Sequence, residues 1–137
     1  MYIYEIGAIS CFYKSNQSEL ATSWRNIIDM WAGYKDNVKT FNPTKYYRPD
    51  NIKLNTTDKL AVDQNEYFLN KCDFAIANLD NLMESPGSIY ELVRFKIMGK
   101  PVIAFGQEQW SPHIKSCITY FAKDLENALD TIEELFL

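Results

Sequence analysis

Two nearly continuous apolar runs, at residues 73–79 and 101–105, constrain the fold of this chain more than any other feature. Runs of this length are typical of parallel strands that are buried on both faces of a sheet. Between them lie a Ser-Pro-Gly turn and an amphipathic segment that stops at Gly99, which indicates a helix. Pro86 suits the first turn of that helix, because its missing N–H would have no partner there. Strand, helix and strand in this order predict a parallel sheet with crossover helices.

The same alternation continues through the rest of the sequence. Further strands are expected at residues 2–9, 38–41 and 118–122. Further helices are expected at residues 18–33, 60–71 and 124–137, with a polar and aromatic surface loop at 44–58. The sequence therefore predicts one α/β domain, residues 1–137, built as a doubly wound, flavodoxin-like or Rossmann-like, five-stranded parallel sheet with helices on both faces.

The helix expected at residues 18–33 has a clear apolar stripe. Ser18 is the candidate N-cap. The stripe is formed by Leu20, Trp24, Ile27, Ile28 and Trp31. This spacing predicts that these side chains pack on the sheet and that the charged side chains of the helix lie on its other side.

Composition narrows the classes of function. With 47% hydrophobic residues, a chain of 137 residues can bury a sizeable core. The net charge is -4 and the Lys and Arg residues are scattered, which argues against a nucleic acid polymer as partner. Three widely spaced cysteines, Cys11, Cys72 and Cys117, favour reduced thiols, and no segment has the length of a membrane span. We expect a cytoplasmic protein that binds a small ligand.

Several well-known catalytic motifs are absent. The sequence has no Gly-x-Gly-x-x-Gly after its first strand, no Gly-Lys-Ser phosphate loop, no Cys-x-x-Cys and no His-Glu-x-x-His. His113 is the only histidine, so a Ser-His-Asp triad and a histidine-rich metal site are not expected. We expect neither a metal nor a cofactor, and carboxylates must carry any catalysis.

Glu91 is the strongest candidate for such a carboxylate. It is expected in the first turn of the helix that follows the Ser-Pro-Gly turn, at the carboxyl end of a strand, where α/β sheets bind ligands. The helix dipole and the free N–H groups of the first turn stabilise an anion. Glu91 is therefore a candidate nucleophile, the other interpretation being a solvated helix residue.

Taken in order, these segments resemble the nucleoside 2-deoxyribosyltransferase family, which includes related 2′-deoxynucleoside 5′-monophosphate N-glycosidases. The sharpest similarity is Ser-Pro-Gly-Ser-Ile-Tyr-Glu-Leu at residues 85–92, followed by Gly-Lys-Pro-Val-Ile at 99–103. The opening strand with its Gly-Ala-Ile loop, the Asn42-Pro43 turn and the strand at 73–77 are also similar. The resemblance covers about residues 2–106.

The resemblance implies a reaction and its partners. Glu91 would attack the sugar of a 2′-deoxynucleoside or its 5′-monophosphate, cleave the N-glycosidic bond and form a covalent deoxyribosyl-enzyme. The sugar would then pass to another nucleobase or to water. Tyr4 would face the sugar beside Glu91. Ser111 or Ser116 lies in the region from which a neighbouring subunit completes the family's sugar site, which implies a homo-oligomer.

Asn65 departs from the family pattern. The family usually has an Asp at this position, which hydrogen-bonds or protonates the leaving base, and an amide cannot deliver a proton. Either Asp63 or Glu66 replaces that acid from a shifted helix, or the chain is a catalytically impaired nucleotide-binding or sensor protein with the same pocket. A third hypothesis is an unrelated flavodoxin-like domain that binds another small ligand in the same crevice.

Ser85 is a second departure, because nucleoside transferases commonly have an Asp there that binds the sugar 5′-hydroxyl. With Gly87 and Ser88, Ser85 offers donors at a helix N-terminus that suit a 5′-phosphate, although it could equally be a simple N-cap. The remaining candidates for substrate contact lie in the loop after the first strand, in the loop that would cover the base, and at the start of the central strand. They are Gly7, Ala8, Ile9 and Ser10; Tyr47 beside Tyr46; and Asp73. Lys14 is a weaker candidate for a phosphate contact.

Overall fold

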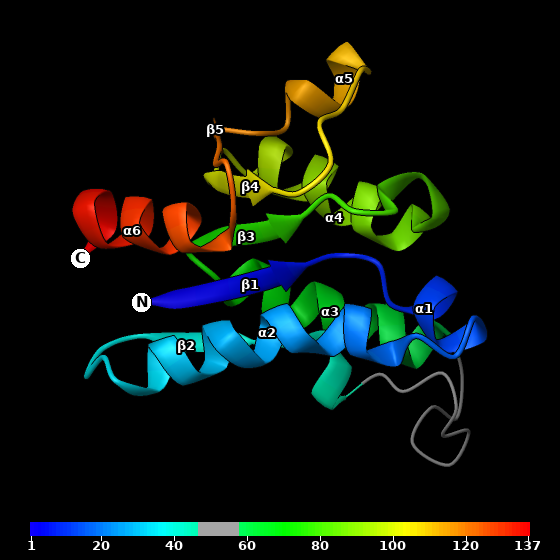
Figure 1. Cartoon of the computed structure of the whole chain (residues 1–137), viewed down its shortest axis with the longest axis horizontal. Coiled ribbons are helices and arrows are strands. Elements are labelled where there is room, and N and C mark those ends of the chain that lie inside the picture. The colour runs from blue at the N-terminus through cyan, green and yellow to red at the C-terminus, as the bar shows by residue number, and fades with distance from the viewer. Residues whose placement is uncertain (47–57) are drawn as a thin grey trace.

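The computed structural model describes residues 1–46 and 58–137, which form a single five-stranded sheet with helices on both of its faces (Figure 1). The strands are β1 (Tyr2–Ile6), β2 (Lys39–Phe41), β3 (Phe74–Asn78), β4 (Val102–Phe105) and β5 (Tyr120–Phe121). Their order in space is β2-β1-β3-β4-β5, and every neighbouring pair is parallel. The predicted doubly wound, flavodoxin-like sheet is therefore confirmed.

The four helices expected from the sequence are present. They are α2 (Ser18–Gly33), α3 (Asp58–Lys71), α4 (Pro86–Ile97) and α6 (Leu125–Phe136). Short helices that the sequence did not indicate follow several strands: α1 (Ser10–Lys14), α5 (Pro112–Lys115) and the 3-10 turns η1 (Pro43–Lys45) and η2 (Leu82–Glu84). The residue that precedes α2 is Gln17, so Ser18 is the first helical residue and not the predicted N-cap.

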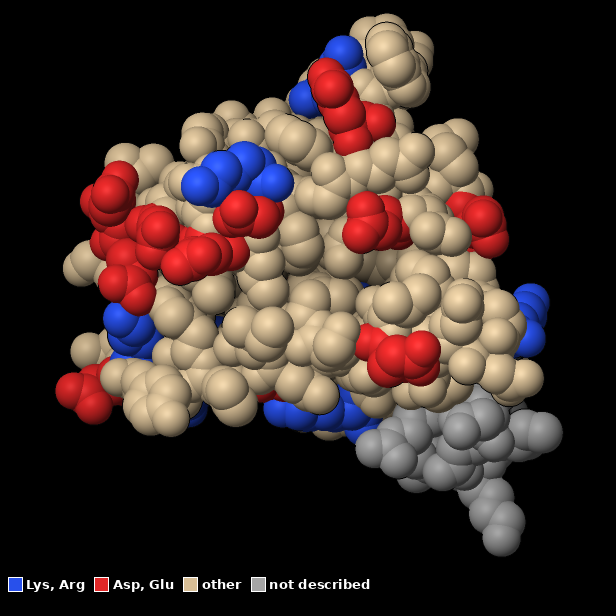
Figure 2. All heavy atoms as spheres, viewed as in Figure 1, with Lys and Arg blue, Asp and Glu red and all other residues tan. Residues whose placement is uncertain are grey.

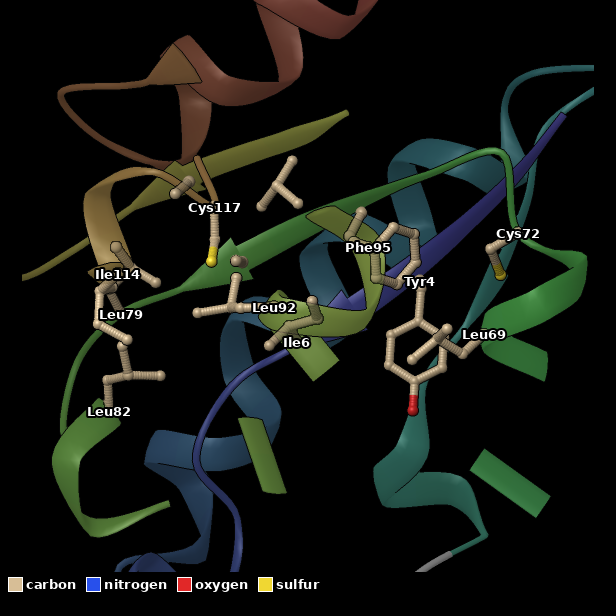
Figure 3. Packing of buried hydrophobic residues seen from close by; sticks show 14 of the residues in the cluster. Tyr4, Ile6, Leu69, Cys72, Leu79, Leu82, Leu92, Phe95, Ile114 and Cys117 are labelled. Atoms are coloured by element: carbon tan, nitrogen blue, oxygen red, sulfur yellow. The ribbon is translucent and has the colours of Figure 1, made fainter. Parts of the chain in front are cut away.

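The core has two layers, one on each face of the sheet. Successive side chains of a strand point to opposite faces. Tyr4 and Ile6 of β1 therefore pack with buried residues of α3 and α4, as Figure 3 shows for Leu69, Leu92 and Phe95. The other layer contains buried residues of β1, α2, β3, β4 and α6: Ile3, Trp24, Ile28, Ile76, Phe105, Leu129 and Ile132.

Helix α2 is rotated relative to the predicted stripe. Its buried residues are Ala21, Trp24, Arg25, Ile28 and Ala32. Leu20 and Ile27 are 46% and 48% exposed, so neither belongs to the core. The prediction that the charged residues of this helix lie away from the sheet is wrong for Arg25, which is fully buried. Carbonyl groups and an aromatic ring surround its guanidinium, and spacing in the sequence cannot reveal such partners.

Strand β1 ends at Ile6, three residues earlier than expected, and Gly7 begins the turn into α1. Gly7 is required by close packing, because a Cβ atom there would lie 2.8 Å from a ring carbon of Trp24. The turn therefore lies against α2.

The surface in the view of Figure 2 carries several separate acidic groups, many of them over α6, and no continuous patch of Lys and Arg. None of the helices in the described part of the chain is long and apolar enough to cross a membrane.

Candidate active site

A pocket of about 300 Å³ lies beyond the carboxyl end of β1, between the β1–α1 turn, η1, α3 and the start of α4. In a 2-1-3-4-5 sheet the connections from β1 and β3 run to opposite faces, and this switch point is where ligands bind. The pocket is lined by Gly7, Ile9, Ser10, Pro43, Ala61, Val62, Asn65, Glu84, Ser85, Pro86, Gly87, Ser88 and Glu91.

Glu91 lines the pocket and is only 9% exposed. It lies five residues after Pro86, in the second turn of α4 and not in the predicted first turn. Burial raises the pKa of Glu91 to about 7, although a hydrogen bond from Tyr4 and the charge of Arg25 act to lower it. The predicted stabilisation of the anion by the helix terminus is therefore outweighed by desolvation. At neutral pH both forms of Glu91 are populated.

Tyr4 lies directly behind Glu91. Its hydroxyl donates a hydrogen bond of 2.7 Å to Oε1 of Glu91, which joins β1 to α4 across 87 residues of sequence. The Tyr4 ring is fully buried, and its centre lies 5.1 Å and 5.8 Å from those of Phe41 and Phe95. Burial, followed by the charge of Glu91, raises the pKa of Tyr4 well above its usual value, so the phenol remains a donor. The packed ring thus fixes the orientation of the Glu91 carboxyl.

The two serines at the start of α4 are paired with each other. Ser85 precedes the helix, and its hydroxyl oxygen lies 2.8 Å from that of Ser88. Ser85 occupies the N-cap position, but its side chain makes no capping bond to the backbone. The two hydroxyls form a polar wall beside Gly87.

Most of the predicted site residues come together at this pocket. Eight line it: Gly7, Ile9, Ser10, Asn65, Ser85, Gly87, Ser88 and Glu91. Tyr4 reaches the site through its bond to Glu91. Tyr47 lies outside the described residues.

Three predicted substrate contacts do not lie at the pocket. Ala8 is buried against α1 and α2. Asp73 precedes β3 and accepts a hydrogen bond of 2.7 Å from the backbone N–H of Tyr2, so it lies at the opposite end of the parallel strands. Ser116 donates to the carbonyl of His113 and does not line the pocket of this chain. Asp73 therefore has a structural partner at the other end of the sheet, whereas a role of Ser116 in the site of a neighbouring subunit stays a prediction.

Neither candidate for the missing acid lies at the pocket. Asp63 pairs with Lys59 on the exposed side of α3. Glu66 accepts hydrogen bonds from Tyr90 and from Nε of Arg94, the latter at 3.2 Å. These contacts direct Glu66 toward the outer part of α4. The helix is therefore not shifted in the way that a replacement for Asn65 would require.

Sequence reasoning missed one ionisable group at the site, Glu84 of η2, which lines the pocket. Among the described lining residues, only Glu84 and Glu91 are ionisable, and none is Lys or Arg. Lys14 lines a neighbouring hollow, with Ser10 and Glu84, and not the pocket itself. Glu84 comes directly before the Ser-Pro-Gly turn, and that position is the one sequence signal that could have found it.

The sheet and its helices define a flavodoxin-like α/β protein with a pocket at the switch point of its sheet. No protein-family model matches the sequence, and no curated protein matches it. The solved structure of a 2-deoxyribosyltransferase from Bacillus psychrosaccharolyticus is similar over 92% of this chain and 88% of that chain, with a TM-score of 0.70 and 18% sequence identity. A conserved protein from Enterococcus faecalis V583 is similar over 96% of this chain and 87% of that chain, with a TM-score of 0.60 and 14% identity. The resemblance seen in the sequence is therefore confirmed at the level of the fold.

Proposed function

We propose that this protein cleaves the N-glycosidic bond of 2′-deoxynucleosides and transfers the deoxyribosyl group to another nucleobase or to water. The observation that carries the proposal is the Glu91 carboxyl, which is buried, fixed by Tyr4 and open to a pocket at the switch point. The similar structure of a 2-deoxyribosyltransferase supports the same reaction class.

In the proposed reaction the Glu91 carboxylate forms a bond to C1′ while the bond from C1′ to the base nitrogen breaks. The electron pair of that bond leaves with the base. A second base, or water, then attacks C1′, loses its proton to solvent and releases Glu91 as a carboxylate, with net retention of configuration. The Tyr4 phenol keeps its proton and holds Oε1 of Glu91 throughout. A missing 2′-hydroxyl makes the oxocarbenium-like transition state easier to reach.

The leaving base meets Asn65 on α3. The amide can bind a base edge with its carbonyl and NH₂ groups but has no proton to give. A base that departs as an anion therefore takes its proton from solvent. We expect bases that are stable as anions to leave fastest.

The charge of the pocket favours a nucleoside over its 5′-monophosphate. Glu84 stands beside Ser85 and Ser88, where the sequence suggested a phosphate contact, and the described lining residues include no Lys or Arg. Two carboxyl groups on a wall whose described residues include no Lys or Arg would repel a dianion. The serine hydroxyls and Glu84 suit an uncharged 5′-hydroxyl instead.

The alternative function is binding without cleavage, and Asn65 is the observation that favours it. A protein with the same pocket but no acid for the leaving base would retain a nucleoside or nucleotide as a sensor. Both functions use the same lining residues, so only turnover distinguishes them.

The decisive experiment is chromatography of free base released from a panel of 2′-deoxynucleosides and their 5′-monophosphates, with and without an acceptor base. We expect release from nucleosides, with kcat/KM rising as the pH passes through about 7, the pKa of Glu91. Glu91→Gln removes the nucleophile and should reduce release at least ~10³-fold while ligand affinity remains.

Glu134→Gln is the matched control, because it makes the same chemical change at an exposed position on α6. Release that persists in Glu91→Gln contradicts the proposed nucleophile. If no substrate is cleaved but one raises the melting temperature, the binding alternative is correct.

A further inference from the structure

A buried arginine supports the pocket from the face of the sheet opposite α4. Arg25 of α2 has no exposed surface, and its Nη2 donates a hydrogen bond of 2.9 Å to the carbonyl of Gly7, which lines the pocket. Nη1 of Arg25 donates to the carbonyl of Ala21, and the guanidinium carbon lies 4.3 Å from the centre of the Trp24 ring. Two carbonyls and one ring thus hold the cation directly against the β1–α1 turn.

The acid nearest to Arg25 does not neutralise it. Nε of Arg25 lies 3.9 Å from Oε2 of Glu5, and among the described residues neither oxygen of Glu5 has a hydrogen-bond partner. Burial, followed by the negative charge of Asp29, raises the pKa of Glu5 and favours its protonated form, although Arg25 acts to lower it. Burial lowers the pKa of Arg25 only to about 10, and Arg25 remains a cation. The result is a buried positive charge that makes no hydrogen bond to a carboxylate of the described residues.

The Arg25 charge acts on the pocket. Ionisable groups from three elements face Glu91: Tyr4 of β1, Arg25 of α2 and Glu66 of α3. The first two lower the pKa of Glu91, while burial and the charge of Glu66 raise it. Arg25 in turn is faced by Glu5 and Tyr4 of β1, Tyr13 of α1 and Glu91 of α4. Among the described groups that face Glu91, only Arg25 carries a positive charge.

We propose that Arg25 is a positioning residue for Glu91, which fixes the Gly7 turn beneath the pocket and favours the carboxylate form of Glu91 through its unpaired charge. An effect of Arg25 on catalysis rests on the proposed function. The effect of Arg25 on the protonation of Glu91 does not. Sequence position gives no hint of it, because Arg25 and Glu91 lie on different helices on opposite faces of the sheet.

The test is a carbon NMR titration of protein labelled at its glutamate carboxyl groups, with the Glu91 signal assigned by its absence in Glu91→Gln. Arg25→Met removes the charge and should raise the pKa of Glu91 by about one unit or more. Arg25→Lys keeps the charge but not the planar fork, and should leave the pKa nearer to that of the unchanged protein. Glu5→Gln is the matched control, because it replaces a neutral acid by a neutral amide in the same buried layer.

If Arg25→Met does not fold, the pKa of Glu91 is measured in the double variant Glu5→Met/Arg25→Met. This variant also lacks the Arg25 charge, and no buried acid then lies against a methionine side chain. An unchanged pKa of Glu91 in either folded variant overturns the proposal. A pKa of Glu91 that falls in Glu5→Gln also overturns it, since Glu5 would then be the anion that neutralises Arg25. The titration needs no turnover, so failure of base release in the unchanged protein would refute the proposed function and leave this result standing.

Discussion

Strand β1 places a buried ionisable side chain on each face of the sheet, and the two faces hold these side chains in different ways. Tyr4 points toward α4 and bonds to Glu91, which opens onto the pocket. Glu5, the next residue, points toward α2 and meets Arg25 in a sealed layer. Both carboxyls are desolvated, with pKa values of about 7 for Glu91 and about 9 for Glu5. Burial alone therefore does not distinguish the candidate nucleophile, because of these two acids Glu91 combines burial with a hydrogen bond from Tyr4 and access to the pocket.

The largest expected effect is on the free energy of unfolding and comes from the sealed layer between β1 and α2. Arg25→Met leaves the buried carbonyls of Gly7 and Ala21 without their side-chain donor, and should lower the free energy of unfolding by about 3 kcal/mol. Urea denaturation measures this loss. Glu5→Met/Arg25→Met should be less destabilised than the single variant, because two apolar side chains then pack together. If the double variant loses as much as the single one, the carbonyl contacts, and not the buried pair, stabilise this layer.

On the face of the sheet that carries the pocket, substitutions should change the rate of base release more than the free energy of unfolding. Asn65→Asp places an acid on the pocket wall, and general acid catalysis at the leaving base should raise base release on the order of 10²-fold. Release of purine and of pyrimidine bases, measured side by side, shows which base benefits. Asn70→Asp, on the same helix but away from the pocket, is the control. Equal rates in both variants would mean that departure of the base does not limit turnover.

The pH dependence of stability separates the two carboxyls. A carboxyl whose pKa is higher in the folded state than the usual 4.5 stabilises the fold at low pH, and this contribution is lost as the pH rises to the folded pKa. The loss runs from about pH 4.5 to 7 for Glu91 and to about 9 for Glu5. Glu91→Gln should therefore be more stable than the unchanged protein by about 3 kcal/mol at pH 8.

Thermal unfolding from pH 4 to 9 measures both effects. Relative to the unchanged protein, the gain of Glu91→Gln should stop growing near pH 7, whereas that of Glu5→Gln should grow further toward pH 9. If the gains in stability of both variants level off at the same pH, the pKa values of Glu91 and Glu5 do not differ.

The sequence predicts the sheet, its central strands and most of the pocket, because those depend on local periodicity and on the rule that ligands bind at the carboxyl ends of parallel strands. It does not predict the ionisation of Glu91, since that depends on the burial of the carboxyl and on a donor, Tyr4, that is 87 residues away in sequence. The buried side of α2 is missed for the same reason. Arg25 looks like a surface charge until the carbonyl of Gly7 and the ring of Trp24 are placed around it.

The smallest expected effect on stability comes from removing the hydrogen bond that Tyr4 donates to Glu91. Glu5 has no such donor among the described residues. Tyr4→Phe keeps the packed ring but deletes the donor to Oε1 of Glu91, at a cost of about 1 kcal/mol in the free energy of unfolding. Because that hydrogen bond favours the carboxylate, the pKa of Glu91 should rise above about 7, toward the value of Glu5. The pH at which kcat/KM reaches half its maximum should rise with it, while Tyr34→Phe, at a side chain that is 85% exposed, should change neither quantity. If the pKa of Glu91 stays at about 7 in Tyr4→Phe, the phenol does not account for the difference between the two acids.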